Sequence, residues 1–244
     1  MFTFNRKKLF IILSLLISTA VIKNTSAGVM INNTRIIYDQ KHKSANVTLT
    51  NVTNGHYAVQ VWINGESDRS DEKSAFVATP SIFRLDPGQE QIVKILSLPA
   101  SLTKDRETVF YFNAQEIPAT NKADNNNKLV MAIRTRIKVF YRPSHLAIAP
   151  QKAAATLQWK TVDKEGKTWL QVTNPSPYYI TFAEMALRNG KQKVDAHDPE
   201  MLPPLSTQSY PLNQKASSAE GSVDFSIIND YGGITHYSNT PIQK

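Results

Sequence analysis

The chain has 244 residues, a formal net charge of +8 and no cysteine. The lack of cysteine excludes disulfide staples, thiol catalysis and a cysteine-ligated zinc site, so the fold must depend on its core. Residues 1–27 contain four cations and no acid, and without them the formal charge falls to +4. An excess of this size is no particular argument for nucleic-acid binding.

The first 27 residues have the order of a secretory signal peptide. Arg6, Lys7 and Lys8 precede an apolar run over residues 9–22, and small residues follow up to Ala27. This order predicts export and cleavage after Ala27. The alternative, a transmembrane anchor, needs a run of about 20 apolar residues, and this one is shorter and interrupted by Ser and Thr. No comparable run follows, so we expect the mature chain to be soluble and not inserted in a membrane.

The 217 residues after Ala27 are rich in strand patterns and turn residues. Residues 45–53 (ANVTLTNVT) show the alternation clearly, because Val47, Leu49 and Asn51 share one face, as in a half-buried antiparallel strand. Strand patterns also cover residues 29–39, 56–64, 91–99 and 107–118. No helical period continues beyond about three turns. The predicted fold class is therefore all-β, as a sandwich.

A pause at residues 144–151 separates two sets of strand patterns. The second set covers residues 156–160, 168–174, 178–189, 210–212, 222–230 and 235–239. Pro143 and Pro150 bracket the pause, which predicts two sandwiches, at residues 28–143 and 147–244. Because the connection is short, we expect the two domains to keep a fixed angle with a cleft between them.

The sequence carries no catalytic signature. It lacks the G-x-S-x-G elbow, a phosphate-binding glycine loop and the H-E-x-x-H motif, so we expect neither an enzyme nor a cofactor. Asp195, His197 and Asp198 offer possible metal ligands, but their polar, proline-flanked setting is typical of a solvated loop, and no metal site is predicted.

Residues 131–143 (MAIRTRIKVFYRP) form a strand pattern with an apolar face and a cationic face. Met131, Ile133 and Ile137 occupy the apolar face, while Arg134 and Arg136 lie on the other. Alternation alone does not decide whether the apolar face completes this protein's own core or the core of a partner.

Several charges lie inside or beside apolar strand patterns. Arg35 lies in the first pattern of the mature chain, Glu107 precedes VFYF, Arg142 follows VFY and Asp230 ends SIIND. A charge in such surroundings needs a partner unless it reaches water at the end of the strand.

Six segments together resemble the PapD-like periplasmic pilus chaperones of Gram-negative bacteria. They occur in the family's order and span nearly all of the mature chain: TRIIY (34–38), ATPSIFRLDPG (78–88), DRETVFYFNAQEIP (105–118), RIKVFYRP (136–143), NPSPYYIT (174–181) and INDYGG (228–233). The resemblance implies two immunoglobulin-like domains arranged as a boomerang, and a chaperone that escorts pilus subunits (pilins) across the periplasm to an outer-membrane usher.

The resemblance also implies how subunits are bound. A pilin lacks the last strand of its sandwich, and a chaperone strand fills the groove. Here Leu129, Met131 and Ile133 would insert into that groove. Arg35 and Lys138 match the pair that holds the subunit's C-terminal carboxylate. A further match gives an inter-domain charge network that fixes the cleft angle, formed by Glu107, Arg142 and Asp230.

Some points stay open in the sequence. Strict alternation gives Lys138 and Ile133 opposite faces, so the strand must bend or bulge if both contact the subunit. The resemblance suggests a cis peptide at Thr79-Pro80, although cis bonds are a minority even before proline. The short polar loop at residues 119–128 favours the short-loop branch of the family. The exposed apolar face also allows the free protein to cap itself by self-association.

Two other functions are compatible with an exported β-sandwich protein. An adhesin or carbohydrate-binding protein would present exposed aromatic loops, whereas the loops here are mostly Asn, Asp, Lys and Ser. A periplasmic hydrolase would need a nucleophile and a base, and the sequence suggests no such pair.

Overall fold

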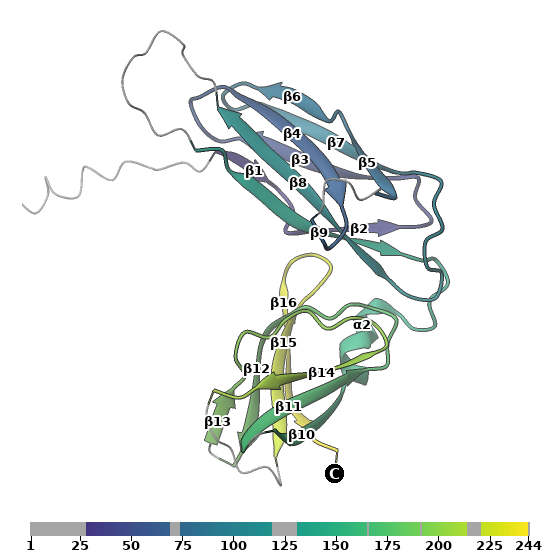
Figure 1. Cartoon of the computed structure of the whole chain (residues 1–244), viewed down its shortest axis with the longest axis vertical. Coiled ribbons are helices and arrows are strands. Elements are labelled where there is room, and N and C mark those ends of the chain that lie inside the picture. The colour runs from purple at the N-terminus through teal and green to yellow at the C-terminus, as the bar shows by residue number, and fades with distance from the viewer. Residues whose placement is uncertain are drawn as a thin grey trace, which may run out of the picture.

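The computed structural model describes residues 28–68, 74–118, 131–164, 166–190, 192–213 and 221–243. Over these ranges the chain is nearly all β-strand, with one short helix, α2 (Pro150–Ala153), continued by a 3-10 turn, η2 (Ala154–Thr156). Two β-sandwich bodies meet at an angle, with α2 close to the junction (Figure 1). The predicted all-β, two-domain fold is confirmed, while the boundaries at residues 143 and 147 stay predictions.

The described part of the chain contains no helix that is both long enough and apolar enough to cross a membrane.

Two sheets face each other in the N-terminal domain. The first has the order β1-β3-β7-β5 and the second the order β2-β9-β8-β4-β6. All pairs are antiparallel except β2 with β9, which run parallel. The strands are β1 (Val29–Ile31), β2 (Arg35–Asp39), β3 (Ser44–Asn51), β4 (Tyr57–Asn64), β5 (Phe76–Thr79), β6 (Ile82–Leu85), β7 (Glu90–Ser97), β8 (Thr108–Pro118) and β9 (Arg134–Arg142).

Alternating side chains from both sheets fill the core of this domain. Val47 and Leu49 of β3, Val93 of β7, and Phe112 and Val139 of the second sheet are all fully buried. The expected face of β3, with Val47, Leu49 and Asn51 turned inward, is confirmed. Burial of such side chains stabilises the fold by about 1.5–3 kcal/mol each, which compensates for the missing disulfides.

Residues 29–39, expected as one strand, form two. β1 pairs with β3 in the first sheet, and β2 pairs with β9 in the second. The chain changes sheets at Asn32–Thr34, where the turn-prone asparagines interrupt the ladder. A single continuous strand could not belong to both layers, so the prediction was wrong at this point. Strands β5 and β6, on either side of the cis Thr79-Pro80 peptide, were also not anticipated.

The C-terminal domain has two sheets and a core of its own. Its sheets have the orders β10-β11-β14 and β13-β12-β15-β16, and Trp159 packs at the centre against Phe182 and Phe225. The strands are β10 (Gln158–Lys164), β11 (Lys167–Asn174), β12 (Phe182–Asn189), β13 (Gln192–Asp195), β14 (Ser206–Pro211), β15 (Ser222–Ile228) and β16 (Ile234–Pro241).

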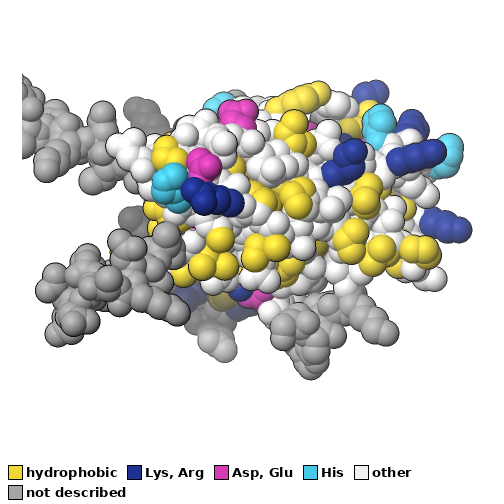
Figure 2. All heavy atoms as spheres, turned by 90° about the horizontal axis from the view of Figure 1, so that it is seen from above, with side chains coloured by type: hydrophobic (Ala, Val, Ile, Leu, Met, Phe, Trp, Pro, Cys, Tyr) yellow, Lys and Arg dark blue, Asp and Glu magenta, His cyan; other side chains and the backbone are white. Residues whose placement is uncertain are grey.

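The upper end of the N-terminal domain, seen from above, carries hydrophobic side chains interspersed with Lys and Arg (Figure 2). Several apolar residues of this domain are exposed although they lie in strands, including Val77, Ile82 and Ile92.

Candidate functional site

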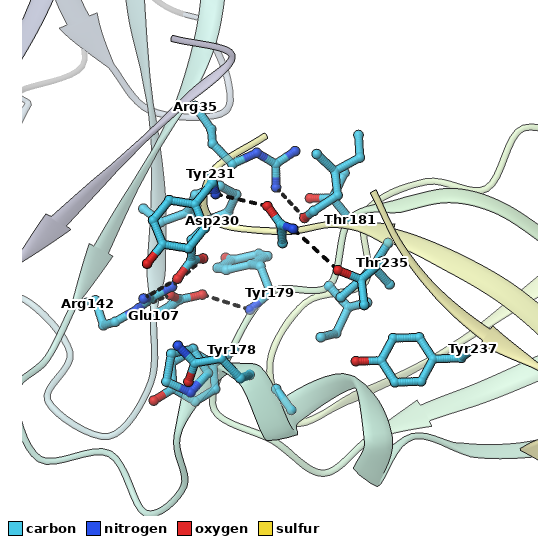
Figure 3. A pocket seen from close by; sticks show the side chains of 18 residues that line it. Arg35, Glu107, Arg142, Tyr178, Tyr179, Thr181, Asp230, Tyr231, Thr235 and Tyr237 are labelled. Atoms are coloured by element: carbon cyan, nitrogen blue, oxygen red, sulfur yellow. Dashed lines mark hydrogen bonds and ion pairs between the residues drawn. The ribbon is translucent and has the colours of Figure 1, made fainter. Parts of the chain in front are cut away.

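A cavity of about 280 Å³ lies where the two domains meet. Its lining comes from both domains: Arg35, Phe140 and Arg142 from the N-terminal one, and Tyr179, Ile228 and others from the C-terminal one. The ring of Phe140 lies 5.7 Å from that of Tyr179, so an aromatic contact spans the junction. Figure 3 shows charged and aromatic side chains turned toward one another in this cleft.

Arg35 and Lys138 are neighbours because β2 and β9 run parallel. The two residues are direct partners in that register, so their side chains leave the sheet on the same face. Burial, and then the positive charge of Arg35, lower the pKa of Lys138. Burial also lowers the pKa of Arg35, against the attraction of Asp230. Neither cation forms an ion pair with an acid of the described residues.

Arg35 is held in place but not saturated. Its Nη1 donates to the carbonyl oxygen of Ile228 in the C-terminal domain at 2.8 Å, while its Nε is buried without an acceptor among the described residues. Two adjacent cations, one of them with an unused donor, can attract an anion, and a carboxylate is the planar acceptor that suits arginine best.

The face of β9 that meets the cleft is opposite to the face that meets the core. Ile137, Val139 and Tyr141 pack in the N-terminal core, whereas Phe140 lines the cleft and Lys138, the β9 partner of Arg35, shares the face of Phe140. The register between β8 and β9 is unbroken from Arg134 to Tyr141, so this part of the strand contains no bulge. From Ile137 onward, the apolar face of residues 131–143 therefore completes this protein's own core.

The residues just before β9 are different, because they are apolar and exposed. Met131 is 68% exposed and Ile133 47%. Ile133 stays close to β8, since its carbonyl oxygen accepts the Glu116 N–H at 2.9 Å. Leu129, the third predicted groove residue, lies outside the described residues, as does the loop at 119–128.

One edge of β9 is open beside these residues. The register of β2 with β9 begins at Arg35 and Lys138, so no described strand pairs with the outer edge of residues 134–137. Unpaired N–H and C=O groups on such an edge can accept an additional strand.

Glu107, Arg142 and Asp230 meet across the domain junction. Arg142 Nε lies 2.7 Å from a Glu107 oxygen, and its Nη1 and Nη2 lie 2.7 and 2.9 Å from the two Asp230 oxygens (Figure 3). Burial raises the pKa of the Glu107 carboxyl, while Arg142 and the Tyr179 N–H act against that rise. Burial alone would lower the pKa of Arg142, but the bonds and charges of Asp230 and Glu107 outweigh it and raise that pKa.

The backbone of the C-terminal domain contributes contacts that the sequence did not predict. The Tyr179 N–H donates to Glu107 at 2.9 Å, and the Glu107 N–H donates to the carbonyl of Pro177, also at 2.9 Å. Tyr231, on the loop after β15, is 93% exposed at the cleft. In the sequence, the glycine-rich segment INDYGG indicated this loop. Contacts made by backbone atoms have no comparable signal in a sequence.

Asp195, His197 and Asp198 lie at the end of β13 and just after it. Within the described ranges no group of three potential ligands converges on one point. The His197 and Asp198 side chains lie mostly in solvent, whereas Asp195, expected in a loop, ends β13.

Comparison with known proteins identifies both domains. The family model for the "Pili and flagellar-assembly chaperone, PapD N-terminal domain" matches residues 28–147, and that for the "Pili assembly chaperone PapD, C-terminal domain" matches residues 152–239.

Individual relatives match along nearly the whole chain. The probable fimbrial chaperone YadV of Escherichia coli (strain K12) is 40% identical over 217 residues, covering 85% of this chain and 87% of that protein. The chaperone protein PapD of Escherichia coli is 32% identical over 231 residues, covering 93% and 91%. The crystal structure of the YadV chaperone has a TM-score of 0.76 at 35% identity, covering 86% and 98%. The chain belongs to the PapD-like family of pilus assembly chaperones.

Proposed function

We propose that this chain binds pilus subunits in its cleft and along β9, and delivers them to an outer-membrane usher. The observation that carries the proposal is the pair of cations, Arg35 and Lys138, beside an open strand edge and without an acidic ion-pair partner among the described residues. A carboxylate bound there would accept charge-assisted hydrogen bonds of about 1.5–3 kcal/mol each.

The subunit's C-terminal carboxylate is the anion that fits both features. A terminus is a fixed point, so its capture at Arg35 and Lys138 sets the register of the subunit strand that pairs with β9. Register decides binding, because a shift by one residue turns each apolar side chain to the wrong face.

Leu129, Met131 and Ile133 then fill the open groove of the subunit. Each buried aliphatic side chain contributes about 1.5–3 kcal/mol, and each main-chain hydrogen bond about 0.5–1.5 kcal/mol. The exposure of Met131 and Ile133 in the free protein supports this role. Binding of this kind needs no catalytic group, and the protein acts without one.

Export to the periplasm, with cleavage after Ala27, precedes the binding of subunits. The order of charged, apolar and small residues before Ala27 supports cleavage there, and the family match that begins at residue 28 agrees with it. A similar protein, at 29% identity and a TM-score of 0.66, is the periplasmic chaperone SfaE.

The test co-expresses this chain with the pilin encoded nearest to it and measures the soluble complex in the periplasm. Arg35→Ala and Lys138→Ala should each abolish recovery of the subunit, whereas Arg84→Ala, on the exposed β6, should leave it unchanged. Lengthening the pilin by two C-terminal residues should also prevent capture, because the carboxylate moves. Normal recovery with both cleft variants would refute the carboxylate anchor.

A further inference from the structure

Glu116 is a buried acid without a cationic partner in the described residues. Its side chain lies on the core-facing side of β8, after those of Phe112 and Ala114, and Glu116 is only 6% exposed. No described Lys, Arg or His lies within ion-pair distance of it. A carboxylate at the end of an apolar row needs a compensating charge or several hydrogen bonds.

The carboxylate of Glu116 lies against the first residues after the predicted cleavage point. Its Oε1 accepts the Val29 N–H at 2.7 Å. A Cβ atom at position 28 would overlap all three atoms of the carboxyl group, so only glycine leaves the space that the carboxyl occupies. The backbone nitrogen of Gly28 is bonded to the Cα atom from which that Cβ would extend. The nitrogen therefore lies within a few ångströms of the Glu116 carboxylate.

We propose that the α-amino group of Gly28, freed by processing, binds the buried Glu116 carboxylate and completes the N-terminal domain. The inference rests on the proposed cleavage after Ala27. Hydrolysis of the Ala27–Gly28 bond by a signal peptidase consumes one water and leaves a carboxylate on Ala27 and an ammonium group on Gly28. The ammonium and the Val29 N–H then approach the same carboxyl group from two consecutive residues.

The position of this ion pair explains what it stabilises. β1 has three residues and lies at the edge of the first sheet, held by β3. Chain termini stay ordered only where they are tied down. Glu116 connects this edge to the second sheet and, through its N–H, to Ile133 beside the open edge of β9. In the uncut chain the Gly28 nitrogen is a neutral amide and the charge–charge interaction is absent.

The experiment combines N-terminal acetylation with Glu116→Gln in the exported, full-length mature protein. Its intact mass must first match a chain that begins at Gly28; another start would refute the cleavage and the inference with it. The α-amine is acetylated in urea near neutral pH, where the chain is unfolded and the α-amine reacts in preference to lysine because its pKa is about 8 rather than about 10.4, and the protein is then refolded. Acetylation should lower the equilibrium constant for folding about tenfold in the unsubstituted protein, and less than twofold in the Glu116→Gln variant.

Glu200→Gln, an exposed acid in the other domain, is the matched control and should keep the tenfold effect of acetylation. Equal effects of acetylation in the unsubstituted protein and in the Glu116→Gln variant would overturn the inference while leaving the cleavage and the subunit-binding proposal intact. If Glu116→Gln does not fold, the acetylation rate of the native protein decides: a bound ammonium should react about tenfold more slowly than the same group in urea, and equal rates would overturn the inference.

Discussion

Arg35 and Lys138 are adjacent cations, and the proposed binding of a carboxylate depends on this adjacency. Their adjacency depends on parallel pairing between strands that lie far apart in the sequence. The family resemblance suggested the pair, but neither periodicity nor composition could show that the two side chains leave the sheet together. The bond from Arg35 to the Ile228 carbonyl was equally invisible, because backbone acceptors have no residue signature.

The lowered pKa of Lys138 predicts how carboxylate binding depends on pH. Burial and Arg35 lower this pKa in the free protein, and a bound carboxylate would raise it again. The affinity for the carboxylate therefore has its full value below the lowered pKa and falls as pH rises through it. This decline starts at a lower pH than it would for an ordinary lysine, whose pKa is near 10.4. Burial raises the pKa values of Tyr111 and Tyr179, which moves the titration of these groups to higher pH.

Calorimetric titration of a peptide copied from the pilin C-terminus, between pH 7 and 10, measures this dependence. Lys138→Arg should remove most of the decline, since arginine keeps its charge. An equal decline of affinity in the unsubstituted protein and in the Lys138→Arg variant would mean that a group other than Lys138 titrates.

The two halves of β9 have different surroundings. The second half of the strand completes the core of the N-terminal domain through Val139 and Tyr141. The first half, which begins just after the exposed Ile133, has an open edge. The alternation in residues 131–143 was readable from the sequence, but the point where one role changes to the other was not. That point is set by where β2 begins, and β2 begins there because Asn32–Thr34 carry the chain from one sheet to the other.

Ile133→Asp should abolish subunit capture without unfolding the chaperone. In the free protein the residue is 47% exposed, so the new carboxylate stays hydrated and the free energy of unfolding should change by less than about 0.5 kcal/mol. In the complex the same charge would be buried in an apolar groove without a partner.

Pull-down of the co-expressed pilin and urea unfolding measure the two effects separately. Ile82→Asp, at a residue 61% exposed on the opposite edge of the same sheet, is the control and should capture the subunit normally. Unchanged capture by Ile133→Asp would contradict the role of this residue in the groove.

Charged groups join the two domains across their junction. Strand periodicity predicted the all-β fold and the two domains, and the family resemblance implied the three charges at the junction. The sequence did not predict β5, β6 and β13, which have only four residues each and show too little alternation to stand out. It also could not show that the backbone of Pro177 and Tyr179 binds Glu107, which makes this acid a second connection between the domains.

Two substitutions in this network should have different effects. Arg142→Ala leaves Glu107, whose side chain is 2% exposed, without its cation, and should destabilise the N-terminal domain by about 3–5 kcal/mol. Asp230→Asn keeps the Arg142–Glu107 pair and removes a partly exposed charge, so the free energy of unfolding should change by only about 1 kcal/mol or less.

Asp230→Asn should nevertheless loosen the angle between the domains, because the Arg142–Asp230 bonds cross the junction directly. Pairs of spin labels, one in each domain, should give a broader distance distribution in this variant than in the unmodified protein. Asp224→Asn removes an ion pair with Arg188 inside the C-terminal domain and is the matched control, with an unchanged distribution expected. An equally narrow distribution in Asp230→Asn would mean that the Glu107 contacts with Pro177 and Tyr179 hold the cleft angle by themselves, and subunit capture should then be insensitive to the loss of Asp230.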